Sequence, residues 1–297
     1  MSTSTPTLPW CAGEASRCVY TGPIREAQFG SRTKEVFQVW EVQSARLGFL
    51  HPFPRVEYAN DSYRTAVNGS SAIEDYFRLH AAQQPGYLAL FAHLLRPGLV
   101  VADCGCGGGA LLDLVKARTT ARTIAIEPFV GYHASLRERG HEVYPTTEAA
   151  LAAGVTGIDL ALSFHVIEHV DDPLAYLQAM RRLVGADGRA VVLTPNWDDI
   201  LMRLDPARMA PFFYRRVHNY YFTAQSLRWL GQRAGWAKAD DIFYHEFGLA
   251  NAILWLRDGR PSGHTRLPEI DAAADVAWKQ KLEGSGFANN VGVLLHV

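Results

Sequence analysis

Short apolar segments alternate with helical segments from residue 99 onward, and this alternation constrains the fold more than any other feature of the chain. The apolar segments are residues 99–103, 123–127, 159–163 and 189–194, with a weaker one at 141–145. Helical patterning falls between them, at 110–117, 131–139 and 173–184. Short buried strands that alternate with helices are typical of a parallel sheet covered on both faces.

The chain changes character on either side of this region. Thr223 is placed to cap a helix that ends near Arg233, and strands are expected at 242–245 and 291–297. The last strand follows a long excursion at 248–290, so it is free to run antiparallel to its neighbours. Ser71 and Glu74 have the spacing of a capping box, which predicts a helix from about residue 72, followed by another at 87–95.

The first 68 residues are broken by prolines and glycines, and only 36–42 alternates like a half-exposed strand. We therefore expect an N-terminal, β-rich appendage at 1–68 and an α/β domain at 69–297, with 248–290 inserted as a cap.

The composition narrows the classes of partner. The formal net charge is −1, which gives no electrostatic case for a nucleic-acid partner. The sequence has no apolar run long enough to span a membrane and no signal-peptide pattern. Four cysteines are too few for a disulfide scaffold in 297 residues, so we expect a reducing, cytoplasmic setting. The oligomeric state is not indicated.

The stretch VADCGCGGGALLDLV (101–115) leads a strand into a glycine loop and then a helix. Glycines let a ligand approach the backbone closely, and the helix start carries partial positive charge. Asp103, directly before the loop, argues against a doubly charged pyrophosphate and suits a cationic ligand. Glu127 ends the next strand, where an acid accepts hydrogen bonds from a ribose diol. Together they favour a nucleoside with a cationic tail.

These residues resemble the first two motifs of class I S-adenosylmethionine-dependent methyltransferases. Three more stretches are similar to later motifs of that family, in the same order: SFHVIEHVDDP (163–173), GADGRAVVLTPN (185–196) and HNYYFTAQSLRWLGQRAGW (218–236). The set is similar to the small-molecule branch that includes the ubiquinone O-methyltransferases. The resemblance implies a Rossmann-like α/β fold with a mostly parallel seven-stranded sheet and an antiparallel last strand.

The resemblance also implies a set of residues that bind S-adenosyl-L-methionine. The methionine part would contact Gly105, Gly107 and Gly109, with Asp103 near its amino group. Glu127 would hold the ribose hydroxyls, and Pro128 and Phe129 would flank the adenine. Phe164 and His165 would line the methionine and sulfonium region.

Cysteines and histidines also raise the question of a metal. Cys104 and Cys106 lack nearby partners for a closed zinc site, and we read them as small residues that fill the loop. Some members of the branch carry a zinc ribbon near the N-terminus, of which one cysteine of four would remain here. Some relatives bind magnesium through E-x-x-E-H and a histidine, but His165 replaces the first acid. We predict no metal.

The stretch PFFYRRVHNYYF (211–222) is rich in aromatic and cationic groups. It is interpreted either as a hydrophobic cap over the sheet edge or as a lid that excludes water from a sulfonium. His218, Tyr220 and Tyr221 are the lid candidates, and Tyr76 is expected to face the same cavity. With His165, these three form our candidate catalytic set, although spacing singles out no general base among His165, His169 and His218.

Three activities remain open. The first is methyl transfer to a small-molecule acceptor, in which the protein aligns the nucleophile and removes water. The second uses the 3-amino-3-carboxypropyl carbon and releases methylthioadenosine, as in azetidine-2-carboxylate synthases, which need S-adenosylmethionine alone. The third is a non-catalytic protein that binds the cofactor.

Overall fold

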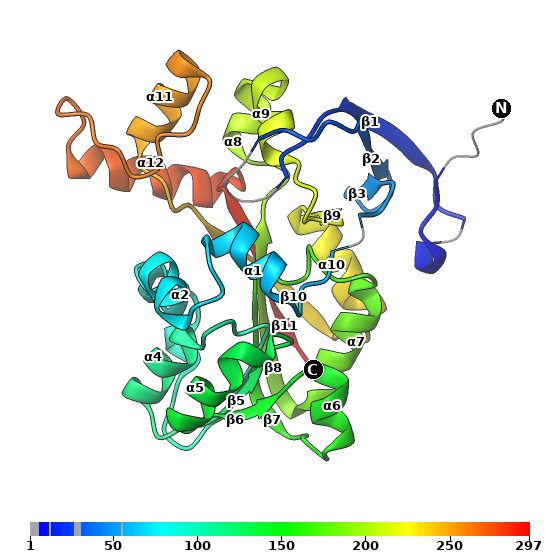
Figure 1. Ribbon diagram of the computed structural model, residues 1–297, viewed down its shortest axis with the longest axis vertical. Helices are drawn as coiled ribbons and strands as arrows, with labels where there is room; N and C mark the ends of the chain where they lie inside the picture. The colour runs from blue at the N-terminus through cyan, green and yellow to red at the C-terminus, as the bar shows by residue number, and fades with distance from the viewer. Residues whose placement is uncertain (1–5, 12, 27–30, 55) are drawn as a thin grey trace.

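The computed structural model describes residues 6–11, 13–26, 31–54 and 56–297. Its centre is a seven-stranded sheet with the order β10-β11-β8-β7-β4-β5-β6 (Figure 1). The strands are β4 (Val100–Cys104), β5 (Arg122–Ile126), β6 (Glu142–Tyr144), β7 (Ile158–Phe164), β8 (Val184–Pro195), β10 (Lys238–Tyr244) and β11 (Asn290–His296). Only β11 runs antiparallel to its two neighbours. The predicted fold class is confirmed.

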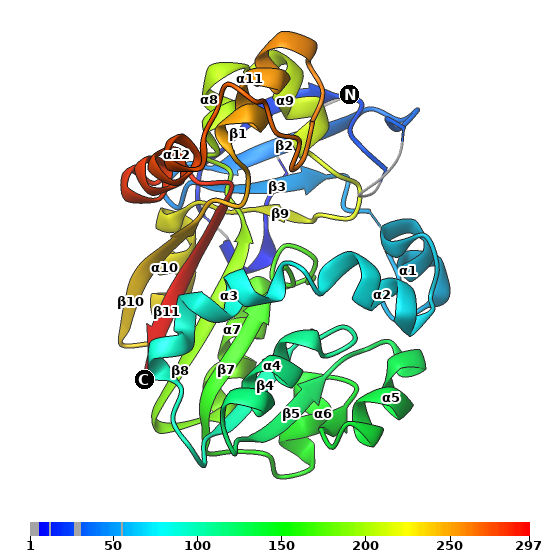
Figure 2. The same cartoon turned by 90° about the vertical axis from the view of Figure 1, so that its left-hand side faces the viewer.

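Helices cover both faces of this sheet. One face carries α6 (Thr147–Ala152), α7 (Pro173–Leu183) and α10 (Ala224–Arg233), and the other carries α3 (Gln84–Phe91), α4 (Ala110–Arg118) and α5 (His133–Glu138) (Figure 1 and, for α3, Figure 2). Successive strand residues alternate between the two cores: Val101 packs with the α3–α4 side and Ala102 with the α7–α10 side. Both are fully buried, which explains why the strands lack polar alternation.

Two predicted helix caps have different outcomes. Thr223 caps α10, and its side chain accepts a hydrogen bond of 3.2 Å from Ser226 N. The prediction of a capping box formed by Ser71 and Glu74 is wrong. Helix α2 (Ile73–His80) starts after Ala72 without a side-chain cap, because Ser70 Oγ accepts from Ala72 N instead.

The long excursion after β10 is helical. It forms α11 (Leu249–Asp258) and α12 (Ala272–Ser285), which lie near α8 (Ile200–Leu204) and α9 (Pro206–Phe213) at one end of the molecule (Figure 2). Short 3-10 turns occur at Pro9–Cys11, Ala92–Leu94 and Val130–Tyr132. None of the described helices is both long enough and apolar enough to cross a membrane.

A second sheet has the order β1-β2-β3-β9, and we call it the N-terminal sheet. Its first three strands are β1 (Ser16–Gly22), β2 (Phe37–Val42) and β3 (Leu47–His51), and β9 (Tyr220–Tyr221) joins from far later in the chain. Phe49 pairs with Tyr220, and Gly48 pairs with Tyr221. The N-terminal sheet therefore shares a strand with the rest of the chain, and the division at residue 68 stays a prediction.

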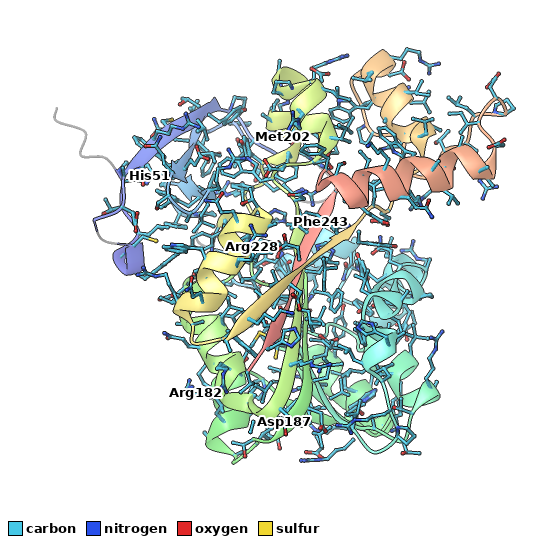
Figure 3. All side chains as sticks on the ribbon, turned by 180° about the vertical axis from the view of Figure 1, so that it is seen from behind. His51, Arg182, Asp187, Met202, Arg228 and Phe243 are labelled. Carbon is cyan, nitrogen blue, oxygen red and sulfur yellow. The ribbon has the colours of Figure 1, made fainter. Side chains whose placement is uncertain are left out.

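The two ends of the central sheet differ. Arg182 and Asp187, near the start of β8, lie at one end, whereas Met202 of α8 and His51 of β3 lie toward the other (Figure 3). The carboxyl ends of the parallel strands thus point toward the N-terminal sheet and the helical cap. In open α/β sheets, ligands bind at that edge.

Candidate active site

The glycine loop follows β4 at this edge. Gly105, Gly107 and Gly109 have φ of 89°, 55° and 82°, in the left-handed region that favours glycine. The amides of Gly105 and Cys106 donate to Ile126 O at 2.7 and 3.2 Å. These bonds fix the loop against the end of β5, so contacts with a ligand have to come from its Cα atoms, carbonyls and remaining amides.

Glycine is also required in this loop because side chains of other elements approach it closely. A Cβ atom at Gly105 would lie 2.3 Å from Val166 Cγ2, in the segment after β7. A Cβ atom at Gly108 would lie 2.3 Å from a ring carbon of Tyr76 in α2, whose hydroxyl donates to Cys106 O at 3.3 Å. The loop is therefore enclosed by α2 on one side and by the β7 end on the other.

Glu127 lies directly after β5 and is 1% exposed. Its Oε2 accepts from Gly107 N at 2.8 Å, and its Oε1 accepts from Phe129 N at 2.8 Å. Oε1 also forms an ion pair with Arg64 of α1 (Asp61–Asn68). The carboxylate is held in a fixed orientation beside the loop, which fits the predicted ribose-binding role.

Asp103 is the last but one residue of β4 and is 3% exposed. Burial and the charge of Glu127 raise the pKa of Asp103 to about 7. A cationic ligand nearby would stabilise the ionised form of this desolvated carboxyl group. Pro128 is partly buried, and the buried Phe129 ring packs edge-on against Tyr132 with centroids 4.9 Å apart.

His165 follows β7 with φ of 56°, one of two described non-glycine residues with positive φ. Its Nε2 lies 3.0 Å from the Tyr87 hydroxyl of α3, and its Nδ1 lies 3.6 Å from Glu168 Oε1. A third of the His165 side chain is exposed, whereas Glu168 is buried. Phe164 packs against Tyr87 with centroids 5.2 Å apart, so it lines the α3 side of this position.

Glu168 is the buried acid of this group. Burial alone would raise the pKa of Glu168, but the imidazoles of His165 and His169 lower it below its ordinary value. Its Oε2 accepts from Thr194 Oγ1 at 2.9 Å. A negative charge therefore persists behind His165, where it favours a proton on Nδ1 and leaves Nε2 as an acceptor.

His218 is also drawn into this group. Its ring lies 4.9 Å from that of His169, and burial lowers the pKa of both imidazoles. His169 Nδ1 donates to Val217 O at 2.5 Å. Glu168, His169 and His218 place one ligand atom each within 4.8 Å of one another, a donor set suited to a transition metal. The sequence predicts no metal, and we assign no step to one.

Two lid candidates lie in the protein core. Tyr220 OH donates to Asp171 O at 2.8 Å, and its ring packs near Trp10. Tyr221 OH accepts from Arg215 N at 3.2 Å. Both hydroxyls are engaged by backbone groups, so we give neither a chemical role below. Burial raises the pKa of the Cys104 and Cys106 thiols, which fits packing residues better than metal ligands.

Sequence reasoning missed Arg64 and Tyr87. Helix α1, which carries Arg64, lies in a segment read as irregular, although Asn60 and Gly69 mark its ends. Asn60 accepts from Tyr63 N at 3.2 Å, and Gly69 has φ of 82°. This pattern of an N-cap asparagine and a C-terminal glycine is a helix signal that the sequence contains.

A family model described as a methyltransferase domain matches residues 77–240, more than half of the chain. The chain belongs to the methyltransferase domain family. The glycine loop, Glu127 and His165 all fall within the matched residues, and the resemblance seen in the sequence is confirmed. S-adenosylmethionine is the cofactor of this family, and the cradle formed by the loop and the buried carboxylate fits it.

Curated relatives of this chain include ubiquinone biosynthesis O-methyltransferases. The one from Cereibacter sphaeroides strain KD131 is 39% identical over 113 residues, which is 36% of this chain and 45% of the relative. The one from Ruegeria sp. strain TM1040 is 34% identical over 105 residues, 33% of this chain and 42% of the relative. The chain thus matches less than half of the length of these relatives.

Solved structures agree on the fold of this chain. An S-adenosylmethionine-dependent methyltransferase from Archaeoglobus fulgidus has a TM-score of 0.53 at 15% identity, over 75% of this chain and 97% of that one. One from Thermotoga maritima has a TM-score of 0.51 at 21% identity, over 75% and 93%. At this identity, the likeness concerns the fold alone.

Proposed function

We propose that this methyltransferase transfers a methyl group to a hydroxyl oxygen of a small molecule, with His165 as the general base. The observation that carries the proposal is the pair formed by His165 Nε2 and the Tyr87 hydroxyl at 3.0 Å. This contact places a hydroxyl against the partly exposed imidazole of His165. His165 directly follows β7, and the next residue, Val166, packs on the glycine loop.

An acceptor hydroxyl would bind to His165 Nε2 in place of the Tyr87 hydroxyl. An acceptor that replaces Tyr87 at Nε2 would have its proton within reach of the imidazole as the oxygen attacks the methyl carbon. The imidazolium that forms would face the Glu168 carboxylate, 3.6 Å from Nδ1. Proton transfer would thus end in an ion pair and not in an isolated buried charge.

The surroundings of His165 favour an aromatic acceptor. Tyr87 packs against Phe164 at 5.2 Å and edge-on to Tyr244 at 5.7 Å, so flat apolar surfaces border the imidazole. A neutral imidazole removes a proton most efficiently from a moderately acidic group. We therefore infer that the hydroxyl is phenolic or enolic. The names of the curated relatives, ubiquinone biosynthesis O-methyltransferases, support oxygen as the nucleophile.

The protein contributes binding and orientation around this proton transfer. The cofactor, when bound, supplies an activated methyl group. Glu127 would hold its ribose hydroxyls, and Asp103 would face its amino group. Tyr76 of α2, packed over Gly107 and Gly108, would limit the access of water.

The test is to identify the nucleoside product. The purified protein is incubated with S-adenosylmethionine and a panel of catechols and simple phenols, and the products are identified by mass spectrometry. S-adenosylhomocysteine together with a methyl ether supports the proposal. Methylthioadenosine above a no-enzyme control would instead assign attack at the aminocarboxypropyl carbon and overturn it. Binding without turnover on any member of the panel would overturn the phenolic acceptor and favour the non-catalytic role predicted as an alternative.

The role of His165 is tested with His165→Gln. The variant is expected to lose about 10²- to 10⁴-fold in kcat while its affinity for S-adenosylmethionine is kept. His264→Gln is the matched control, because this exposed histidine lies far along the chain, where it pairs with Glu246 at 3.6 Å and packs near the Phe247 ring. Treatment with EDTA is expected to leave the rate unchanged. A loss that manganese or zinc restores would assign Glu168 and its histidine neighbours to a metal.

A further inference from the structure

Arg64 pairs with Glu127, the carboxylate that we expect to hold the ribose hydroxyls. Helices α1 and α2 lie next to one another, between the N-terminal sheet and the ends of β4 and β5 (Figure 2). From α1, the Arg64 guanidinium reaches Glu127 Oε1, and the Arg64 side chain is only 13% exposed. The ion pair is therefore largely shielded from water, where charge-assisted hydrogen bonds are strong.

The hydrogen bonds of the Glu127 carboxylate leave too little room for a ribose diol. Oε1 accepts from Phe129 N and from Arg64, which together use both of its lone-pair positions. Oε2 accepts from Gly107 N and keeps one position. Two ribose hydroxyls need one position on each oxygen. The amides of Gly107 and Phe129 lie in the loops that follow β4 and β5, as Glu127 does, whereas Arg64 comes from the separate helix α1. Arg64 is therefore the donor that can be displaced.

We propose that α1 is the gate of the cofactor site and that Arg64 is its latch. The guanidinium holds Glu127 while the site lacks cofactor, and the ribose hydroxyls of S-adenosylmethionine displace it from Oε1. The latch thus lowers the affinity for the cofactor and slows its entry, and it compensates the buried charge of Glu127 until the cofactor arrives.

Aromatic rings around the guanidinium make this exchange feasible. In the position paired with Glu127, its central carbon already lies 5.4, 5.6 and 5.5 Å from the ring centroids of Tyr63, Phe129 and Tyr132. These rings attract a cation independently of Glu127, so Arg64 does not have to leave the site as a free charge. Helix α1 is also tied to its surroundings by Asn68, whose Nδ2 donates to Tyr132 OH at 3.4 Å and whose Oδ1 contacts His80 Nε2 at 2.9 Å, and by the Tyr63 ring, which packs near His169.

The test is the affinity of Arg64→Met for S-adenosylmethionine and S-adenosylhomocysteine, measured by titration calorimetry. Methionine keeps an apolar side chain among the rings and removes the charge. We expect both ligands to bind about tenfold to a hundredfold tighter, the range of one charge-assisted hydrogen bond, with faster association in stopped-flow fluorescence. Without ligand the variant should melt at a lower temperature, and saturating ligand should raise its Tm more than that of the wild type.

Arg78→Met is the matched control, because Arg78 lies in the neighbouring helix α2 and pairs with Asp75 on the surface. It should bind both ligands as the wild type does. Equal or weaker binding by Arg64→Met would overturn the latch and make Arg64 a residue that only orients Glu127. If Arg64→Met does not fold, Arg64→Lys replaces it, with a smaller gain expected and the same criterion.

The latch depends on the cofactor of the family but on neither the acceptor nor His165. Binding and melting are measured without any methyl transfer, so a failure of the proposed O-methyl transfer would leave the latch standing. Conversely, if Arg64→Met bound the cofactor as the wild type does, the latch would be overturned but the proposed methyl transfer would still be decided by the nucleoside product.

Discussion

The backbone amide of Gly107 donates a hydrogen bond of 2.8 Å to Glu127 Oε2. This bond ties the glycine loop after β4 to the acid after β5, two features that the sequence indicated separately. The methionine end and the ribose end of the cofactor site are therefore positioned as one unit. Changes at either residue should be felt at both ends.

Glu127→Gln is expected to weaken S-adenosylmethionine binding by about 1.5–3 kcal/mol, because the amide cannot accept two ribose hydroxyls and keep its backbone donors. Titration calorimetry measures the change. Glu142→Gln, an exposed acid of β6 paired with Arg122, serves as the control and should bind normally. An unchanged affinity in Glu127→Gln would remove Glu127 from the ribose site.

Asp103 should make stability depend on pH in an unusual direction. Its pKa rises from 3.8 to about 7 on folding, so the folded protein holds a proton that the unfolded chain releases between these values. The contribution of Asp103 to stability is therefore lost as pH rises through this window and is constant above about pH 7, with a total of about 4 kcal/mol. Asp103→Asn should remove this slope in urea unfolding measured from pH 5 to 8. An identical slope in the variant would contradict the assignment.

The same group should control cofactor affinity. Below pH 7 the carboxyl group is neutral and no longer attracts the cationic cofactor, so the Kd for S-adenosylmethionine should rise about tenfold between pH 8 and pH 6. Calorimetric titrations at both pH values measure it. In Asp103→Asn the binding should be weak and its Kd independent of pH. If the Kd of the variant still depended on pH as that of the wild type does, another group would be responsible.

Gly105→Ala should destabilise the protein by about 1–3 kcal/mol, because alanine is strained at φ of 89° and its Cβ would meet Val166. The double variant with Val166→Ala should recover only part of the loss, since it relieves the contact but not the backbone strain. Chemical unfolding separates the two contributions. Full recovery would show that the contact alone matters.

Tyr220→Phe is expected to lose about 1 kcal/mol of stability and to keep the wild-type kcat. The reason is that its hydroxyl is bonded to Asp171 O within the core. Thermal melting and steady-state rates measure the two effects. A large fall in kcat at unchanged stability would return Tyr220 to the catalytic set that the sequence suggested.

Local patterns explain why the central fold and the cofactor residues could be predicted. Asp103 is placed by β4, in which it is the last but one residue, and Glu127 is placed by β5, which it follows directly. The order of strands and helices follows from the chain itself. Arg64 could not be found in this way, because its partner lies far along the sequence and only tertiary packing brings α1 onto the β5 end. Tyr87 lies at the start of a helix that was predicted, but its contact with His165 depends on how α3 lies against β7.

The short strand β9 escaped prediction for a related reason. Two residues, Tyr220 and Tyr221, carry no strand pattern, and they pair because the edge of β3 is available to them. The excursion at 248–290 carried no motif, and its two helices pack on a core that also includes α8 and α9. In each case the structure of the segment depends on the element that it packs against, and the sequence of the segment does not identify that element.

The pairing of β3 with β9 has a consequence for synthesis of the protein. The edge of β3 is made early, but its partner strand leaves the ribosome only after the glycine loop and most of the central sheet have been translated. Until then, the N-terminal strands present an open edge that can pair with other chains. We therefore expect the nascent chain to depend on chaperones through this interval, and truncations before residue 220 to aggregate.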